Sequence, residues 1–246
     1  MGISVFGAGT LGARVLAGTS GVRRAITRTE ARWAQLRALG AIPTLDWPTP
    51  GRDDLVVLAL PGSAAQAEAI ARLAGSRPDR AVLVSTTGYH APYAGEVSAG
   101  SPPGASARAQ EAAETEAAFR DWMGDRGTIV RLGGLYTATR GPAAHFARTL
   151  QVRPGPADAP LPLVHYDDAA TLVIRALERP APPVVIGVTA VPTREAFYTT
   201  VAAHLGVPVP PLGPAAGAVA FDLRTCRELL PDPAQPDWRA HLPPAS

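Results

Sequence analysis

The chain has 246 residues, 46% of them hydrophobic, and a formal net charge of +2, which indicates one large globular domain or one domain with a small appendage. Its 23 basic residues are all arginines spread along the chain, so we expect no nucleic-acid interface, which would gather cations on one face. We also expect no membrane span, because no apolar run approaches the ~20 residues required, and no secretory signal. The single cysteine fits a cytoplasmic protein.

Short apolar runs alternate with longer, more polar segments over the first two-thirds of the chain. The runs are typical of strands buried on both faces, and the longer segments are typical of helices. The expected strands are Ile3–Phe6, Val22–Thr27, Ala41–Thr44, Leu55–Leu60, Ala81–Ser85 and Thr128–Leu132. The expected helices are Leu11–Ala17, Glu30–Leu39, Ser63–Leu73 and Ala105–Met123. This alternation predicts an α/β protein with a doubly wound parallel sheet, the Rossmann fold.

The last third of the chain has a different composition. Residues 137–162 are rich in Gly, Pro and Arg and contain one short expected helix. The remaining expected elements are the helices Ala143–Leu150, Asp167–Glu178 and Thr193–Leu205, the strands Leu161–Val164 and Val184–Val188, and a strand and helix within Ala218–Leu230. We therefore expect a dinucleotide-binding domain over residues 1–160. Residues 161–246 would add a last sheet strand and a small substrate-binding lobe.

A glycine-rich loop follows the first expected strand. Gly7, Gly9 and Gly12 have the G-x-G-x-x-G spacing, and Thr10 and Leu11 lie between the last two. The first glycine permits a tight turn, the second lets the backbone approach a pyrophosphate, and the third allows close packing of helix on strand. The helix that follows would direct its N–H groups at the anion. The alternative is a glycine-rich turn that binds no ligand.

The end of the second expected strand distinguishes between cofactors. An NAD site usually has an acidic residue there that binds the ribose hydroxyls. This chain has Thr27 and Arg28, with Arg32 one turn further on, while Glu30 is better placed in the first turn of a helix. Guanidinium groups form charge-assisted pairs with a 2′-phosphate, so we expect NADP rather than NAD. The alternative is that both arginines are solvated surface charges.

Several further segments, in order along the chain, make it resemble the short-chain dehydrogenase/reductase superfamily, and above all its extended and atypical epimerase/dehydratase-like members. These segments are Leu58–Gly62, Val84–Tyr89, Arg131–Tyr136, Val164–Asp168 and Val191–Tyr198. The resemblance implies that Leu60 and Pro61 lie over the cofactor's ribose. It also places Ser85 and Gly133 beside the cofactor. The implied substrate residues are Thr87, Tyr136 and His165. A homodimer that packs through Ala105–Met123 is common in such proteins.

The resemblance also shows what the chain lacks. The superfamily transfers a proton through a Tyr-x-x-x-Lys pair on the helix after the fifth strand, and a Ser or Thr at the strand end orients the substrate oxygen. An approximate alignment puts Ser106 at the tyrosine position and Gln110 at the lysine position, and the chain contains no lysine. Thr86 remains as the orienting residue. Tyr89 and His90 are candidate proton donors, His90 because an imidazole titrates near neutral pH.

Other polar residues have structural explanations. Asp167 is expected to cap the helix after His165, and the glutamates of Ala105–Met123, including Glu116, are expected on its solvent side. The five histidines show no metal-ligand spacing, so we expect no metal.

The favoured interpretation is an NADP-binding enzyme that reduces, epimerises or eliminates on a small-molecule substrate. Two alternatives remain open. One is a non-catalytic NADP-binding regulator or scaffold, and the other is a cofactor-independent cyclase or isomerase on the same fold.

Overall fold

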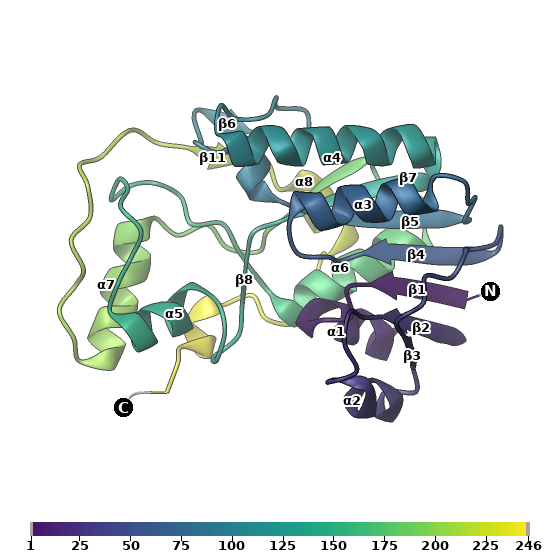
Figure 1. The fold of residues 1–246 in the computed structure, drawn as a ribbon. Coiled ribbons are helices and arrows are strands. Elements are labelled where there is room, and N and C mark those ends of the chain that lie inside the picture. The colour runs from purple at the N-terminus through teal and green to yellow at the C-terminus, as the bar shows by residue number, and fades with distance from the viewer. Residues whose placement is uncertain (1, 245–246) are drawn as a thin grey trace.

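The computed structural model describes residues 2–244, and its centre is a seven-stranded sheet in which every neighbouring pair is parallel (Figure 1). The strand order is β10-β7-β5-β4-β1-β2-β3. The strands are β1 (Gly2–Phe6), β2 (Val22–Ile26), β3 (Ile42–Thr44), β4 (Asp54–Leu58), β5 (Arg80–Thr86), β7 (Gly127–Leu132) and β10 (Val184–Gly187). The order reverses at β1, which is the topological switch point of a doubly wound fold. The predicted Rossmann fold is confirmed.

Helices cover both faces of the sheet. In Figure 1, α3 and α4 lie on one face, and α1 and α6 lie side by side on the other. Their bounds are α1 (Thr10–Gly18), α2 (Trp33–Ala38), α3 (Ser63–Leu73), α4 (Ala107–Met123), α6 (Tyr166–Glu178) and α8 (Arg224–Leu229). Within residues 2–244, no helix has the length and apolar character needed to cross a membrane.

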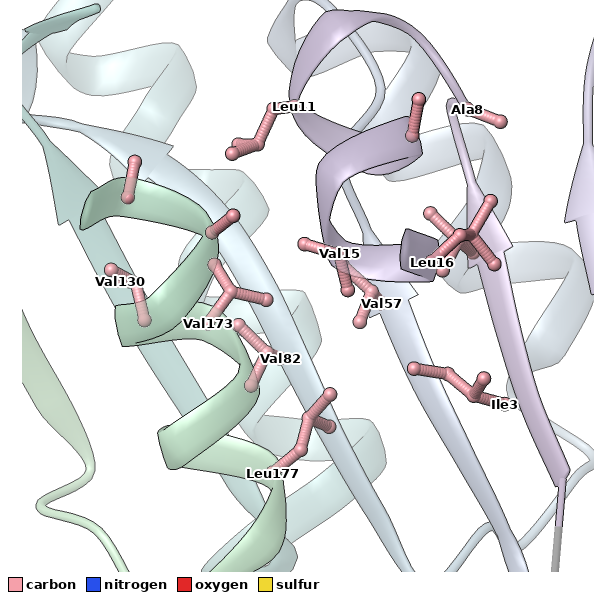
Figure 2. Packing of buried hydrophobic residues seen from close by; sticks show 14 of the residues in the cluster. Ile3, Ala8, Leu11, Val15, Leu16, Val57, Val82, Val130, Val173 and Leu177 are labelled. Carbon is pink, nitrogen blue, oxygen red and sulfur yellow. The ribbon is translucent and has the colours of Figure 1, made fainter. Parts of the chain in front are cut away.

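Side-chain alternation along the strands explains why both faces are apolar. Val57 packs with α1 and α6, whereas its neighbours Val56 and Leu58 pack with α3 and α4. Figure 2 shows the first cluster, in which Val15 of α1 and Val173 of α6 lie over the sheet. Because each strand is buried on both sides, its sequence is a continuous apolar run. This burial is what made the strands predictable.

A smaller lobe stands apart from the sheet (Figure 1). It contains α5 (Pro142–Thr149), α7 (Arg194–Leu205) and the 3-10 helix η3 (Trp238–His241). Phe146, Phe197 and Trp238 share one apolar cluster, with the Phe197 and Trp238 rings 4.7 Å apart. Helix α5 therefore packs with the lobe, although it precedes residue 161, where we expected the C-terminal region to begin.

Two short parallel ribbons connect these parts. They are β8 (Gly134–Tyr136) with β9 (Leu163–His165), and β6 (Glu96–Val97) with β11 (Ala220–Phe221). Neither β6 nor β8 was expected, because two or three residues carry no periodic signal. The candidate site lies where the loops after β1, β4, β5 and β7 leave the carboxyl edge of the sheet.

Candidate functional site

The glycine loop is shaped by its contacts with neighbouring backbone. Gly7 has φ of +90°, and a Cβ atom there would lie 2.5 Å from the carbonyl oxygen of Ala59 after β4. A Cβ atom at Gly12 would lie 2.5 Å from the Gly7 carbonyl oxygen. At Gly9 the nearest atom would be 4.0 Å away, and this glycine is exposed. Packing thus requires Gly7 and Gly12, whereas Gly9 leaves its side of the loop open for a ligand.

The N-terminus of α1 is open at this loop. Gly9 is its N-cap and supplies no side-chain hydrogen bond, and the first turn, from Thr10, contains no acidic residue. Leu11 and Gly12 are buried, which anchors the first turn against the core. The first N–H groups of a helix have no partner within it, so an uncapped end is suited to bind an anion.

Two arginines stand beside the loop at the end of β2. Arg32 Nη1 donates to the Ala8 carbonyl oxygen at 3.4 Å, and Arg32 Nη2 donates to Gln35 at 2.9 Å. Arg28 is exposed, and its guanidinium forms no hydrogen bond or ion pair with another described residue. Thr27 is already engaged, because its hydroxyl donates to the Thr29 carbonyl oxygen at 2.9 Å and accepts from the Trp33 indole at 3.1 Å. The Arg28 guanidinium is therefore free to bind an anion, whereas that of Arg32 is held by Gln35 and Ala8.

The turn after β4 is held in place by the side chain of Gln66. Gln66 Nε2 donates to the carbonyl oxygens of Leu60 at 3.0 Å and Val84 at 2.8 Å, which ties the ends of β4 and β5 together. Leu60 is half-buried and Pro61 is exposed. The contact of Leu60 and Pro61 with a ribose therefore stays a prediction.

A buried ion pair lies behind the end of β5. Glu116 of α4 and Arg131 of β7 are 0% and 1% exposed, and they form two hydrogen bonds of 3.0 and 2.7 Å. The Ser85 hydroxyl donates to Glu116 at 2.7 Å, and Arg120 Nη2 also donates to Glu116, at 3.1 Å. The expectation that Glu116 faces solvent was wrong. It lies one turn after Ala112 and three residues before Phe119, on the inner face of the helix.

The same arginine fixes the turn that follows β5. Arg131 Nη1 lies 3.1 Å from Nε2 of His90, and its guanidinium carbon lies 3.4 Å from the centre of the Tyr89 ring. Burial and the adjacent Arg131 charge lower the pKa of His90 to about 4. His90 is therefore neutral near pH 7, which corrects the expectation that it donates a proton as an imidazolium. The Tyr89 hydroxyl forms no hydrogen bond with another described residue.

The threonines at the end of β5 differ in accessibility. Thr86 caps the 3-10 helix η1 (Thr87–His90), where its Oγ1 accepts from the Gly88 N–H at 3.0 Å. Its own hydroxyl proton stays free to donate. Thr87 is buried and accepts from the Tyr93 hydroxyl at 3.2 Å. Thr86 is thus better placed than Thr87 to meet a ligand.

The positions aligned with the missing Tyr-x-x-x-Lys pair have structural roles. Ser106 is the N-cap of α4 and accepts from the Ala109 N–H at 3.2 Å. Gln110 is exposed and donates to the Gly104 carbonyl oxygen at 2.8 Å. Neither side chain replaces a phenol or an ammonium group.

Tyr136 and His165 meet under the C-terminal segment. Both are buried, with ring centres 5.2 Å apart, and His241 lies 4.4 Å from His165. The Tyr136 hydroxyl donates to the Gln235 carbonyl oxygen at 3.3 Å. Burial, with Asp168 and Asp237 nearby, raises the pKa of Tyr136 to about 12, and burial lowers the pKa of His165. The structure brings these two predicted substrate residues together, but the protein's own tail covers them.

The start of α6 differs from its expected form. The N-cap is His165, whose Nδ1 accepts from the Asp167 N–H at 3.2 Å, so the expectation that Asp167 is the cap was wrong. Asp167 instead pairs with Arg14 of α1 at 2.6 Å. Asp168 is buried and accepts from the N–H groups of Ala234 at 2.7 Å and Gln235 at 3.2 Å, which ties the tail to α6.

Gly133 directly follows β7, as expected, and close packing explains why this position is a glycine. It is buried, its N–H donates to the Gly187 carbonyl oxygen at 3.0 Å, and a Cβ atom there would lie 2.7 Å from the Pro162 carbonyl oxygen. Over residues 2–244, no three His, Cys, Asp or Glu side chains form a group that could hold a metal ion.

Similar proteins are found among solved structures, and not among family models or curated sequences. No protein-family model matches the sequence, and no curated protein matches it. The crystal structure of a human epimerase family protein, SDR39U1, with NADPH superposes with a TM-score of 0.75 at 20% identity, over 98% of this chain and 97% of that one. A conserved protein of unknown function from Silicibacter pomeroyi gives 0.74 at 22% identity, over 98% and 96%. UDP-glucuronic acid 4-epimerase from Bacillus cereus, in complex with NAD, gives 0.72 at 14% identity, over 95% and 92%.

These similarities extend over almost all of each chain and establish the fold. The chain has the fold of these epimerases, as the resemblance predicted.

Proposed function

We propose that the protein binds NADP at the carboxyl edge of its sheet. The observation that carries this proposal is the glycine loop, in which Gly7 and Gly12 are held by backbone packing while Gly9 stays open at the uncapped N-terminus of α1. The N–H groups of the first helical turn, which have no partner within the helix, and the positive end of the helix dipole together suit a pyrophosphate. The position at the switch point of the sheet is where such folds bind ligands.

The choice of NADP over NAD rests on Arg28 and Arg32. The Arg32 guanidinium contacts the loop at Ala8, and that of Arg28, two residues after the end of β2, has no partner among the described residues. A 2′-phosphate carries the charge that such groups recognise, whereas an NAD site would offer a carboxylate to the ribose. One structural neighbour was solved with NADPH and another with NAD, so the neighbours support a nicotinamide dinucleotide in general.

We further propose that the bound cofactor serves catalysis on a small metabolite, by carbonyl or imine reduction, epimerisation or elimination. The dinucleotide would supply the hydride chemistry. Thr86 would orient the substrate oxygen through its free hydroxyl proton, and the Tyr89 hydroxyl, which has no partner among residues 2–244, would donate the proton. His90, being neutral, would hold the turn in place.

A second candidate function is a non-catalytic, NADP-binding regulator. This function is favoured by the polar groups near the end of β5, because Ser85 and Arg131 both donate hydrogen bonds to Glu116. The positions aligned with the missing catalytic pair, Ser106 and Gln110, also bond within the chain. The decrease in NADPH absorbance in the presence of candidate carbonyl compounds distinguishes the two functions. A regulator would bind the nucleotide without oxidising it.

Calorimetric titration of the full chain with NADPH, NADP, NADH and NAD tests the binding proposal. We expect NADPH and NADP to bind more tightly than NADH and NAD, and binding of none of the four would refute the proposal. Gly9→Asp should abolish binding, because its carboxylate would face the pyrophosphate. Gly75→Asp, at an exposed glycine between α3 and β5 where an added Cβ meets nothing within 4 Å, is a control for the added charge.

Arg28→Asp tests the cofactor preference separately. Loss of the Arg28 guanidinium should weaken NADPH binding by at least about tenfold, since charged hydrogen bonds contribute about 1.5–3 kcal/mol. NADH, which has no 2′-phosphate, should be affected far less. Equal losses for the two nucleotides would contradict a phosphate role for Arg28.

A further inference from the structure

A second polar hollow, lined by no residue of the glycine loop, lies between β8, α5 and the first turn of α6. It has a volume of about 610 Å³ and is lined by Leu135, Thr139, Arg140, Gly141, Arg148 and Tyr166. This volume falls within the range typical of small-molecule sites, about 300–1,000 Å³. The hollow is open to solvent, so a ligand can enter without displacing any element.

The charge in this hollow is positive and uncompensated. The guanidinium groups of Arg140 and Arg148 form no hydrogen bond or ion pair with any residue of the described part of the chain, 2–244. No acidic residue lines the hollow. The nearest acid along the chain, Asp167, is already paired with Arg14 at 2.6 Å. Two positive charges therefore face the same space.

Hydroxyl groups complete the lining. The ring of Tyr166 is half-buried and is held under the Arg14 guanidinium, whose carbon lies 5.3 Å from the ring centre. Its hydroxyl forms no hydrogen bond with another described residue. Thr139 lies at the rim, with its Oγ1 3.4 Å from that of Thr137. Donors thus approach the hollow from the loop, the helix α5 and the start of α6.

We propose that this hollow binds the phosphate group of a small phosphorylated molecule. Two guanidinium groups match the charge of a phosphate dianion, and each can donate two parallel hydrogen bonds to its oxygens. A cation would be repelled, and an apolar group would leave the guanidinium groups without partners. The residues that line the hollow are separate from Gly7–Gly12, Arg28 and Arg32, so this site does not depend on the proposed nucleotide function.

Calorimetric titration with inorganic phosphate and with glycerol 3-phosphate, at constant ionic strength, tests the proposal on the full chain. We expect both probes to bind the wild-type protein and to bind Arg140→Ala/Arg148→Ala at least about tenfold more weakly. Arg52→Ala/Arg77→Ala, which removes two positive charges from exposed residues outside the hollow, is the matched control and should bind as the wild type does. Thermal unfolding checks that each variant is folded. Tighter binding of the ester than of free phosphate would identify an organic phosphate as the ligand.

NADPH and acetate complete the experiment. The double variant should keep the wild-type affinity for NADPH, and acetate should bind far more weakly than phosphate. Wild-type protein that binds neither phosphate probe would overturn the proposal, as would a double variant with unchanged phosphate affinity. Parallel loss of NADPH and phosphate affinity would assign the hollow to the nucleotide site and also overturn it. If phosphate binds and NADPH does not, the proposed function fails and this site stands.

Discussion

The loop after β1 and the turn after β5 lie at the same edge of the sheet, but their polar groups have different partners. At the first, the N-terminus of α1 has no side-chain cap and the Arg28 guanidinium has no described partner. At the second, Ser85, Glu116, Arg131 and His90 are joined by hydrogen bonds of 2.7–3.1 Å. The first region is open to a ligand, whereas in the second these four side chains are engaged with one another and only Thr86 and Tyr89 keep free hydroxyl groups.

This difference shows which residue types mark a site dependably. A glycine loop acts through backbone shape, and its ligand-binding N–H groups cannot be diverted by a neighbouring side chain. A serine or histidine at a strand end acts through one or two polar atoms, which a buried ion pair can engage. If the polar network after β5 supports the fold while the glycine loop serves binding, substitutions in the two regions should have different effects.

Removal of Glu116 should have the largest effect. Glu116→Ala leaves Arg131 buried without its counter-charge, so the free energy of unfolding should fall by about 3–5 kcal/mol. Urea unfolding followed by circular dichroism measures this change. Glu114→Ala, at an exposed position on the same helix, is the control and should change stability by less than about 0.5 kcal/mol. Equal effects of the two variants would show that the closed network does not support the fold.

The pH dependence of stability reports on His90. Its pKa is about 4 in the folded protein, where burial and Arg131 disfavour the charged form, against 6.5 for an unperturbed histidine side chain. The unfolded chain therefore binds more protons between these values, and the free energy of unfolding should fall by about 3 kcal/mol as the pH drops from 7 to 4. The lowered pKa of His165 acts in the same direction.

A variant isolates the contribution of His90. His90→Gln keeps an acceptor for Arg131 but does not titrate, so its unfolding free energy should depend less on pH over this interval. His145→Gln, at an exposed histidine, should keep the wild-type dependence. Identical pH profiles for wild type and His90→Gln would contradict the assignment of a neutral, buried His90.

Alanine substitutions in the glycine loop should have a smaller and graded effect. Gly12→Ala forces a Cβ atom to within 2.5 Å of the Gly7 carbonyl oxygen, so the backbone must shift. We expect a loss of about 1–3 kcal/mol in stability. Gly9→Ala meets nothing closer than 4.0 Å and should fold as the wild type does. Thermal unfolding of the two variants measures the contrast, and a destabilised Gly9→Ala would show that the loop is not open at this position.

The sequence predicted the sheet well because its strands are buried on both faces. Runs such as Leu55–Leu60 and Thr128–Leu132 have the continuous apolar character that a parallel sheet requires, and both appear as β4 and β7 within two residues of the expected ends. The ribbon strands β6 and β8 were missed, because a two- or three-residue strand depends on a partner distant in sequence.

We did not predict the closed network, although the sequence positions of Glu116 and Arg131 indicate it. Glu116 lies in the inner-face series Ala109, Ala112, Phe119 and Met123, at spacings of three and four residues. Arg131 lies within an apolar strand. A single acid and a single base, each at a position that should be apolar, predict that they pair with each other. Whether His165 or Asp167 caps α6 depends on the local backbone path, which the sequence pattern does not determine.

Hydrogen–deuterium exchange of the full chain, with and without saturating NADPH, tests the contrast between the open and closed regions most directly. We expect NADPH to slow exchange over residues 7–12 and 28–32, where the N-terminus of α1 and the Arg28 guanidinium are open. Exchange over residues 113–120, which include Glu116 of the closed network on α4, should be unchanged. No protection at residues 7–12 would contradict nucleotide binding at the glycine loop.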